Sequence, residues 1–173
     1  MHLLSVPFES QLDNRSGSGY RECFSSSAAM LARFWGKVSD DDEYNAIRKQ
    51  FGDTTSAQAQ LSALRSLGLQ SYFWTNGCRV DLERELLGGR PVAVGWLHRG
   101  RVTAPTGNGH WSVAVGFNVT HVAMNDPNGE ALVESGGYTR NTNGAGVRYS
   151  WRNWLPRWEV EGPRTGWYLT CSG

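Results

Sequence analysis

The chain has 173 residues, with 17 Lys and Arg, 16 Asp and Glu, and a formal net charge of +1. A balance so close to neutral argues against a general polyanion binder, which normally carries a basic surplus, and against an acidic disordered tail. Hydrophobic residues make up 39 % and aromatic residues 12 % of the chain, which predicts a folded domain. No apolar run is long enough to span a membrane, and the N-terminus has no signal-peptide pattern. We therefore expect a soluble protein, synthesised in the cytoplasm and not inserted into a membrane.

The first half of the sequence predicts an extended arm, a loop and a series of helices. The arm covers residues 3–8, and a loop rich in Gly and Ser covers residues 13–19. Apolar residues at helical spacing, with stop signals after them, predict four helices at residues 23–35, 41–51, 55–67 and 81–87. Ser39 and Asp81 are the expected caps of the second and fourth helices. The acidic run at 40–42 is better explained by a helix start than by a metal site, because acids suit the positive end of a helix dipole.

The second half predicts strands. Apolar runs predict the main strands at residues 91–97, 110–117 and 121–125, after a short strand at 70–74. The polar segment 101–109 is expected to be a mobile loop, and segments 147–158 and 166–170 are expected to add edge strands. These elements predict an α+β fold in which helices pack on an antiparallel sheet, as one domain over residues 1–173.

Cys23 is the most informative residue for function, because it follows the glycine-rich loop and begins a helix. The positive end of the helix dipole and the unpaired N–H groups there favour the thiolate, which is the nucleophilic form of cysteine. The alternative is a buried structural cysteine. Cys78 and Cys171 begin no strong helix and are interpreted as structural or incidental, and a disulfide between them remains open.

A cysteine nucleophile requires a base, and His110 is the best placed of the 4 histidines. It begins an apolar strand directly after a Gly-Asn-Gly turn, so its flank is open while the strand fixes its position. A turn centred near Asn118 would place Asp126 opposite His110, where the carboxylate can orient the imidazole. A change of turn register would break this pairing, and Asn125 is the alternative orienting residue.

Gln11 lies at the end of the N-terminal arm. Its side-chain amide, together with the backbone N–H of Cys23, can donate hydrogen bonds to a developing oxyanion. Taken alone, Gln11 is also consistent with an ordinary surface residue. The histidines and cysteines show no metal-ligand spacing, so no metal and no cofactor are expected.

Five segments of the sequence, in this order, resemble the bacteriocin-processing peptidases and their stand-alone relatives, which are papain-like cysteine peptidases. The first two read Val-Pro-Phe-Glu-Ser-Gln from Val6 and Glu-Cys-Phe-Ser-Ser-Ser from Glu22. The five segments are residues 6–14, 22–30, 89–95, 109–117 and 125–129. Together they cover about residues 3–130, and residues 131–173 show no pattern that can be placed.

This resemblance implies a papain-like fold. It implies Cys23 as the nucleophile, His110 as general base and acid, Asp126 as the orienting residue and Gln11 as the oxyanion donor. The best-known members of the family sit on transporters and cut leader peptides after paired glycines, whereas this sequence contains no transporter. The chemistry is therefore expected to carry over better than the substrate.

Stand-alone relatives without a secretion signal often belong to phages or to bacterial lysis and competition systems. The resemblance thus implies peptidoglycan stem peptides or cross-bridges as the substrate, reached after release from the cell or as part of a virion, with the loop 101–109 as a lid. Two alternatives stay open: a catalytically silent binding or structural module of a phage particle, and acyl transfer in place of hydrolysis. The sequence makes no prediction of the oligomeric state.

The segment from Trp151 to Trp158 is aromatic and basic together. It is consistent with a stacking wall for a sugar or a peptide, or with a nucleic-acid platform. We favour the simpler interpretation that its tryptophans pack on the sheet, and no nucleic-acid partner is expected at this net charge.

Overall fold

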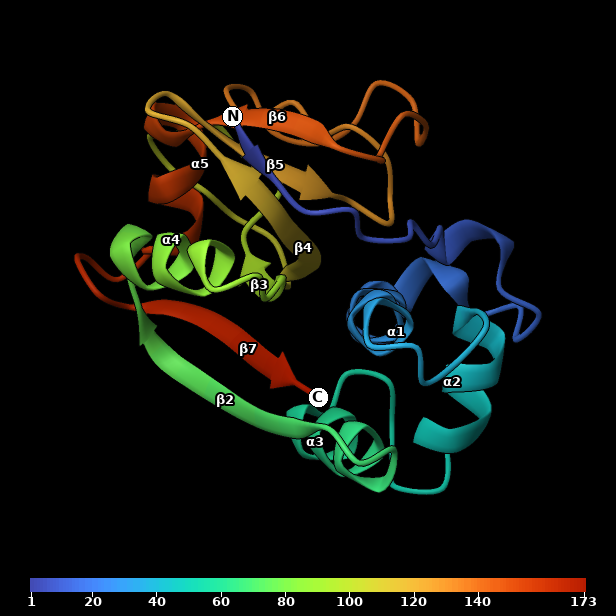
Figure 1. Ribbon diagram of the computed structural model, residues 1–173. Coiled ribbons are helices and arrows are strands. Elements are labelled where there is room, and N and C mark those ends of the chain that lie inside the picture. The colour runs from blue at the N-terminus through green and yellow to red at the C-terminus, as the bar shows by residue number, and fades with distance from the viewer.

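The computed structural model describes residues 1–173, and its strands form one antiparallel sheet (Figure 1). The strand order is β2-β7-β3-β4-β5-β6, and the short β1 pairs with β4 on the path of the N-terminal arm. The strands are β1 (His2–Leu3), β2 (Gln70–Gly77), β3 (Val92–Trp96), β4 (His110–Phe117), β5 (His121–Asn125), β6 (Val147–Ser150) and β7 (Gly166–Ser172).

Helices cover both faces of this sheet (Figure 1). The helices are α1 (Cys23–Phe34), α2 (Asp41–Arg48), α3 (Ala57–Ser66), α4 (Arg79–Leu87) and α5 (Trp151–Trp158), with two short 3-10 helices, η1 (Gln11–Asp13) and η2 (Gly19–Arg21). Helices α1, α2 and α3 build one hydrophobic core against one sheet face, and α4 and α5 build a second core against the other. The α+β prediction, with the N-terminal helices packed on an antiparallel sheet, is confirmed.

Helix α1 is surrounded by other elements, which explains why its polar residues are not exposed. Ser25 and Ser26 are both fully buried and use their hydroxyl groups to bind the neighbouring helices. Ser25 accepts hydrogen bonds from Arg48 of α2 and Gln60 of α3, and Ser26 donates to Asp41 of α2 at 2.9 Å. These bonds hold the helix that carries Cys23 between the sheet and α2 and α3.

Both predicted helix caps are wrong, the cap of α2 by one position and the cap of α4 by three. Asp40, rather than Ser39, caps α2, because its carboxylate accepts from the backbone N–H of Glu43 at 2.8 Å. Cys78 stands at the N-cap position of α4, and Asp81 lies inside the first turn, where it accepts from the Cys78 backbone N–H at 3.0 Å. In both cases a carboxylate still satisfies an N–H group at the start of the helix.

The C-terminal elements differ most from the prediction. Only the first part of the segment 147–158 is a strand, and the rest is helix α5. Trp151, Trp154 and Trp158 repeat at helical spacing and are buried in the second core, so they form no stacking wall at the surface. Strand β7 is not an edge strand, because it lies between β2 and β3.

Candidate active site

Cys23 is the first residue of α1 and is half-buried. The preceding residue, Glu22, is buried and anchors the loop before the helix. Its carboxylate accepts hydrogen bonds from Asn14 at 2.6 Å and from Ser16 at 2.8 Å. The loop is therefore folded back against the start of α1, and the thiol is held where the unpaired N–H groups of the helix converge.

His110 is the first residue of β4 and is almost completely buried. Its Nε2 lies 2.7 Å from Oδ1 of Asp126, which leaves Nδ1 as the nitrogen for any other partner. Burial alone would lower the pKa of His110, but the charge and hydrogen bond of Asp126, together with the Cys23 side chain, raise that pKa to about 10. Near neutral pH the imidazole is therefore a cation between a carboxylate and a thiol.

The contact between His110 and Asp126 forms by a different register from the predicted one. Asn125 pairs with Val113, which moves Asp126 by two residues from the position opposite His110. The shift arises from the turn, where Phe117 pairs with Val122, and from a bulge between Ala114 and Gly116. A shift of two residues keeps a side chain on the same face of the sheet, so the carboxylate still reaches the imidazole diagonally.

Asn125, the alternative orienting residue, is engaged elsewhere. Its Nδ2 donates to the carbonyl of Val6 at 3.1 Å, and its Oδ1 accepts from the backbone N–H of Gly146 at 2.9 Å. Asn125 thus ties the N-terminal arm to the segment before β6, and Asp126 is the side chain that binds His110.

Asp126 has no exposed surface and accepts hydrogen bonds from four groups. Oδ1 binds Nε2 of His110 and the backbone N–H of Asn128. Oδ2 binds the hydroxyl groups of Tyr138 and Tyr149, and the Tyr138 hydroxyl also lies 3.4 Å from Oδ1. Neither tyrosine is predicted from the sequence as part of the site. Both come from the segment after residue 130, where no local pattern connects them to the site.

Gln11 is 3 % exposed, so it is not an ordinary surface residue. Its Nε2 donates to the carbonyl of Gly19 at 2.9 Å, which leaves a second N–H on the same nitrogen, and its Oε1 has no partner. Gly19 lies so close to the Gln11 backbone that a Cβ there would meet the Gln11 carbonyl oxygen at 2.0 Å. Only glycine therefore allows η1 and η2 to meet in this way.

The residues that follow Cys23 and His110 pack against each other and join α1 to β4. Phe24 stacks on Trp111 with ring centroids 3.7 Å apart and an angle of 3° between the planes. On its other side the Trp111 ring lies over Gly95, where a Cβ would come within 2.8 Å of the ring. This stack fixes the helix that carries the thiol relative to the strand that carries the imidazole.

His98 lies beside the same imidazole, with ring centroids 5.1 Å apart. Burial and the positive charge of His110 lower the pKa of His98 to about 4, so His98 is neutral near pH 7. It follows β3, and its position in the sequence predicts only a residue beside a loop. That loop leads directly into His110 and is closed by hydrogen bonds between Arg99 and Thr106.

The other cysteines lie outside this site and are free. Cys171 is buried, and burial raises its pKa to about 12, which makes the thiol unreactive near neutral pH. Cys78 donates a hydrogen bond from its thiol to Asp81 at 3.2 Å. The disulfide that the sequence left open is therefore absent from the structure.

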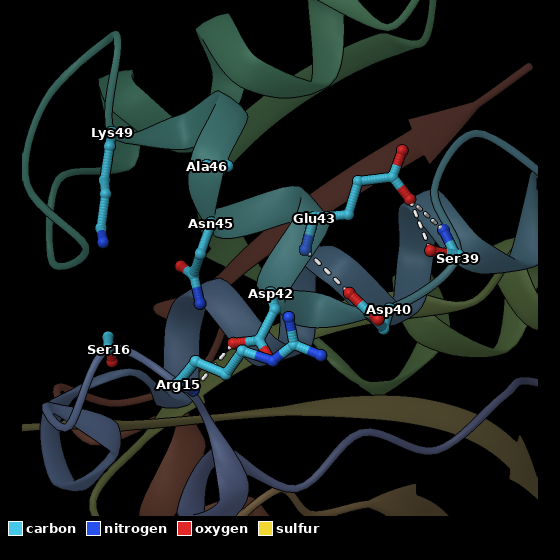
Figure 2. A pocket seen from close by; sticks show the side chains of 9 residues that line it. All are labelled: Arg15, Ser16, Ser39, Asp40, Asp42, Glu43, Asn45, Ala46 and Lys49. Carbon is cyan, nitrogen blue, oxygen red and sulfur yellow. Dashed lines mark hydrogen bonds and ion pairs between the residues drawn. The ribbon is translucent and has the colours of Figure 1, made fainter.

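A polar pocket of about 480 Å³ lies between α2 and the loop around Arg15 and Ser16 (Figure 2). Its walls are charged and polar side chains, several of which bind one another, as Arg15 does with Asp42 and Ser39 with Glu43. None of the four candidate site residues lines it. Asp40 and Asp42 of the acidic run line one wall of this pocket, and Asp40 is the cap of α2.

Comparison with known proteins agrees with the fold. The profile of the Peptidase_C39-like family matches residues 3–154. Comparison with curated protein sequences finds no match. No helix of the chain has both the length and the apolar character needed to cross a membrane.

Three solved structures have the same fold. A protein from Bacillus anthracis described as a C39-like peptidase is 16 % identical, with a TM-score of 0.68, and the match covers 99 % of this chain and 97 % of that one. The peptidase domain of Streptococcus ComA, a bifunctional ABC transporter of a quorum-sensing pathway, is 17 % identical, with a TM-score of 0.62 and coverage of 97 % and 98 %. A double-glycine-motif protease from an AMS/PCAT transporter is 20 % identical, with a TM-score of 0.57 and coverage of 98 % and 92 %. The family profile covers most of the chain, and the chain therefore belongs to the Peptidase_C39-like family of cysteine peptidases.

Proposed function

We propose that residues 1–173 form one cysteine peptidase domain that hydrolyses peptide or amide bonds with Cys23, His110, Asp126 and Gln11. The observation that carries this proposal is the buried His110, which binds Asp126 at 2.7 Å and whose pKa is raised by Asp126 and Cys23. A cationic imidazole beside a thiol is the arrangement that stabilises a reactive thiolate.

In the first half of the reaction, the Cys23 thiolate attacks the carbonyl carbon of the scissile bond. The carbonyl electron pair moves to oxygen, where the remaining N–H of Gln11 and the backbone N–H of Cys23 donate to the oxyanion. The imidazolium of His110 gives its proton to the leaving nitrogen as the C–N bond breaks, which leaves a thioester on Cys23.

In the second half, neutral His110 takes a proton from a water molecule, and the hydroxide attacks the thioester. The C–S bond breaks, the carboxylic acid leaves, and the thiolate and imidazolium are restored. Asp126 keeps the imidazole in one orientation throughout and stabilises its charged form. No metal or cofactor takes part in any of these steps.

A peptide is the substrate class that the comparisons support, since one structural neighbour is a protease solved in complex with the leader peptide. We extend the proposal to the stem peptides or cross-bridges of peptidoglycan, in a phage or bacterial lytic role. The support for this extension is the resemblance to stand-alone relatives. We also propose that the loop 101–109, which leads into His110, borders the bound substrate.

The test is digestion of purified peptidoglycan, and separately of a mixed peptide library, by the wild type and by Cys23→Ala. We expect the wild type to release fragments whose masses identify the bond, and the variant to lose at least about 10⁴-fold in rate. Cys78→Ala is the matched control and should cut like the wild type, because Cys78 lies outside the site.

Cleavage by Cys23→Ala at the wild-type rate would contradict the proposed nucleophile. A folded wild type that cuts neither substrate, and whose Cys23 reacts with iodoacetamide no faster than Cys78 at pH 6, would favour the silent binding module instead. Transfer of the acyl group to an added amine in place of water would identify the enzyme as an acyl transferase.

A further inference from the structure

The oxygen of Asp126 that faces away from His110 is held by two tyrosine hydroxyl groups. Tyr149 of β6 donates to Oδ2 at 2.8 Å, and Tyr138 donates to the same oxygen at 3.1 Å. Tyr149 is 2 % exposed and Asp126 has no exposed surface. We call Tyr138 and Tyr149 together the tyrosine clamp.

A buried carboxylate requires such donors. A charged group removed from water is destabilised unless hydrogen bonds replace its hydration, and neutral hydroxyl groups supply these bonds without adding a competing charge. Asp126 has no Arg or Lys among its hydrogen-bonding partners. The clamp therefore supplies all of the hydrogen bonds to Oδ2.

The two hydroxyl groups act only as donors toward Asp126. Burial and the nearby charge of Asp126 raise the pKa of both Tyr138 and Tyr149, so both keep their protons. The Tyr149 oxygen also accepts a hydrogen bond from the backbone N–H of Ala131 at 2.9 Å, which directs its own O–H toward the carboxylate. The ring of Tyr138 packs edge-on against His110, with centroids 5.9 Å apart.

We propose that Tyr138 and Tyr149 are positioning residues that fix Asp126 so that Oδ1 stays aimed at Nε2 of His110. This inference rests on the proposed function of Cys23, His110 and Asp126. The two hydroxyl groups act through Asp126, which they bind, and neither is bonded to His110 or Cys23. It also gives a role to the C-terminal part of the chain, because it is residues from the loop before β6 and from β6 itself that complete the orientation of the imidazole.

The test measures the reactivity of Cys23 itself and needs no substrate. Alkylation of Cys23 by iodoacetamide is followed by mass spectrometry between pH 4 and 9 in the wild type, Tyr149→Phe and Tyr138→Phe. Loss of a donor destabilises the charged carboxylate and with it the imidazolium. We therefore expect the acidic limb of the alkylation profile to move to higher pH, by roughly one pH unit for Tyr149→Phe and less for Tyr138→Phe.

Tyr44→Phe is the matched control. Tyr44 is also fully buried and also donates from its hydroxyl, to Gln60 at 2.7 Å, but it has no contact with Asp126. Its alkylation profile should superimpose on that of the wild type. Peptide cleavage by the clamp variants, where a substrate is known, should show a lower kcat at unchanged KM.

Profiles of both clamp variants that coincide with the wild type would overturn the inference. If Tyr149→Phe does not fold, as judged by circular dichroism, the decision rests on Tyr138→Phe, whose side chain is less buried. Failure of the proposed function is seen separately, as a wild type that cuts no substrate. The alkylation profiles still decide whether the clamp holds Asp126 in that case.

Discussion

Asp41 is a buried carboxyl group with no cation beside it. It lies at the start of α2, is 3 % exposed and accepts one hydrogen bond, from Ser26 of α1. Burial raises the pKa of Asp41 to about 7, and the nearby charges of Glu9, Asp13 and Asp42 add to this effect. The folded state therefore keeps a proton that the unfolded chain releases near pH 4.

The sign of the resulting pH dependence follows from proton binding. Between about pH 4 and 7 the folded state binds more protons at Asp41 than the unfolded state, so the free energy of unfolding falls as pH rises. We expect Asp41→Asn to remove this decrease. The difference in free energy of unfolding between Asp41→Asn and the wild type should then be more favourable to the variant at pH 8 than at pH 4.5, by on the order of 1–3 kcal/mol.

Urea denaturation at the two pH values measures this difference. Asp42→Asn removes the same charge from the neighbouring, more exposed position and serves as the control, for which we expect a much smaller change. The prediction is contradicted if the free energy of unfolding changes by the same amount between pH 4.5 and 8 in the wild type and in Asp41→Asn. That result would show that Asp41 is already ionised in the folded state.

A second prediction at the scale of single residues concerns Gln11. A side-chain amide that donates to the oxyanion acts only in the transition state, so Gln11→Ala should lower kcat by about 100- to 1000-fold with little change in KM. Gln11→Glu should be at least as damaging, because a carboxylate cannot donate and would repel the oxyanion. Alkylation by iodoacetamide forms no oxyanion, so Cys23 in both variants should still react at the wild-type rate. Parallel loss of alkylation would instead mean that Gln11 only holds the loop in place.

At the scale of elements, the contact between α1 and β4 depends on the absence of a side chain at Gly95. The Trp111 ring occupies the space of that side chain and cannot retreat, because Phe24 is stacked on its other face. An added methyl group at Gly95 would therefore push Trp111 against α1 and separate Cys23 from His110.

We expect Gly95→Ala to reduce kcat by roughly tenfold or more and to lower the free energy of unfolding by about 1–3 kcal/mol. Adding Trp111→Phe to the same chain shortens the ring at the point of the clash. The double variant should therefore be more active and more stable than the sum of the two single changes predicts. Additive losses, measured by urea denaturation and by peptide cleavage, would show that Gly95 and Trp111 act independently.

Sequence reasoning predicts best the elements whose ends are marked by local signals. Helix α1 and strand β4 begin at the predicted residues, because a glycine-rich loop and a turn mark each start. The contact between Asp126 and His110 is also predicted, although the observed strand register differs from the predicted one by two residues. The contact still forms because a shift of two residues leaves Asp126 on the same face of the sheet.

The features that depend on long-range pairing escape sequence reasoning. Strand β7 lies between β2 and β3 because it pairs with residues far away in the sequence, and no local pattern carries that information. The same holds for Tyr138, which lies in a long irregular segment without periodicity and still contacts Asp126. Turn length and the bulge in β4 also depend on interactions that a two-residue repeat does not reveal.

At the scale of the whole molecule, one buried arginine of α5 joins segments that surround the site. Arg157 has no exposed surface and no carboxylate partner. Its guanidinium instead donates to five backbone carbonyl groups, those of Leu97, Arg99, Gly100, Val133 and Glu134. The first three belong to the loop that leads into His110, and the other two precede Tyr138.

Arg157 therefore connects the second core to two segments that lie beside the imidazole, those of His98 and Tyr138. The two segments also meet directly. The backbone N–H of Val102 donates to the backbone carbonyl of Glu134 at 2.9 Å, and the backbone N–H of Gly137 donates to the backbone carbonyl of His98 at 2.7 Å. Burial lowers the pKa of Arg157, but a guanidinium remains charged, and the carbonyl dipoles replace its hydration. The planar fork of five N–H donors matches these acceptors in a way that an ammonium group cannot.

Arg157→Lys keeps the charge but offers three donors on a shorter group, so at least two of the five carbonyl groups must lose their partner. Because the segments 97–106 and 133–138 are otherwise irregular, we expect their amide hydrogens to exchange roughly tenfold faster or more in this variant, while exchange in α1 and β4 changes little. Hydrogen exchange followed by mass spectrometry measures this directly. Arg152→Lys, at an exposed position of the same helix, is the matched control and should exchange like the wild type. Faster exchange spread evenly over the whole chain would mean that Arg157 supports global stability and does not specifically hold the two segments beside His110.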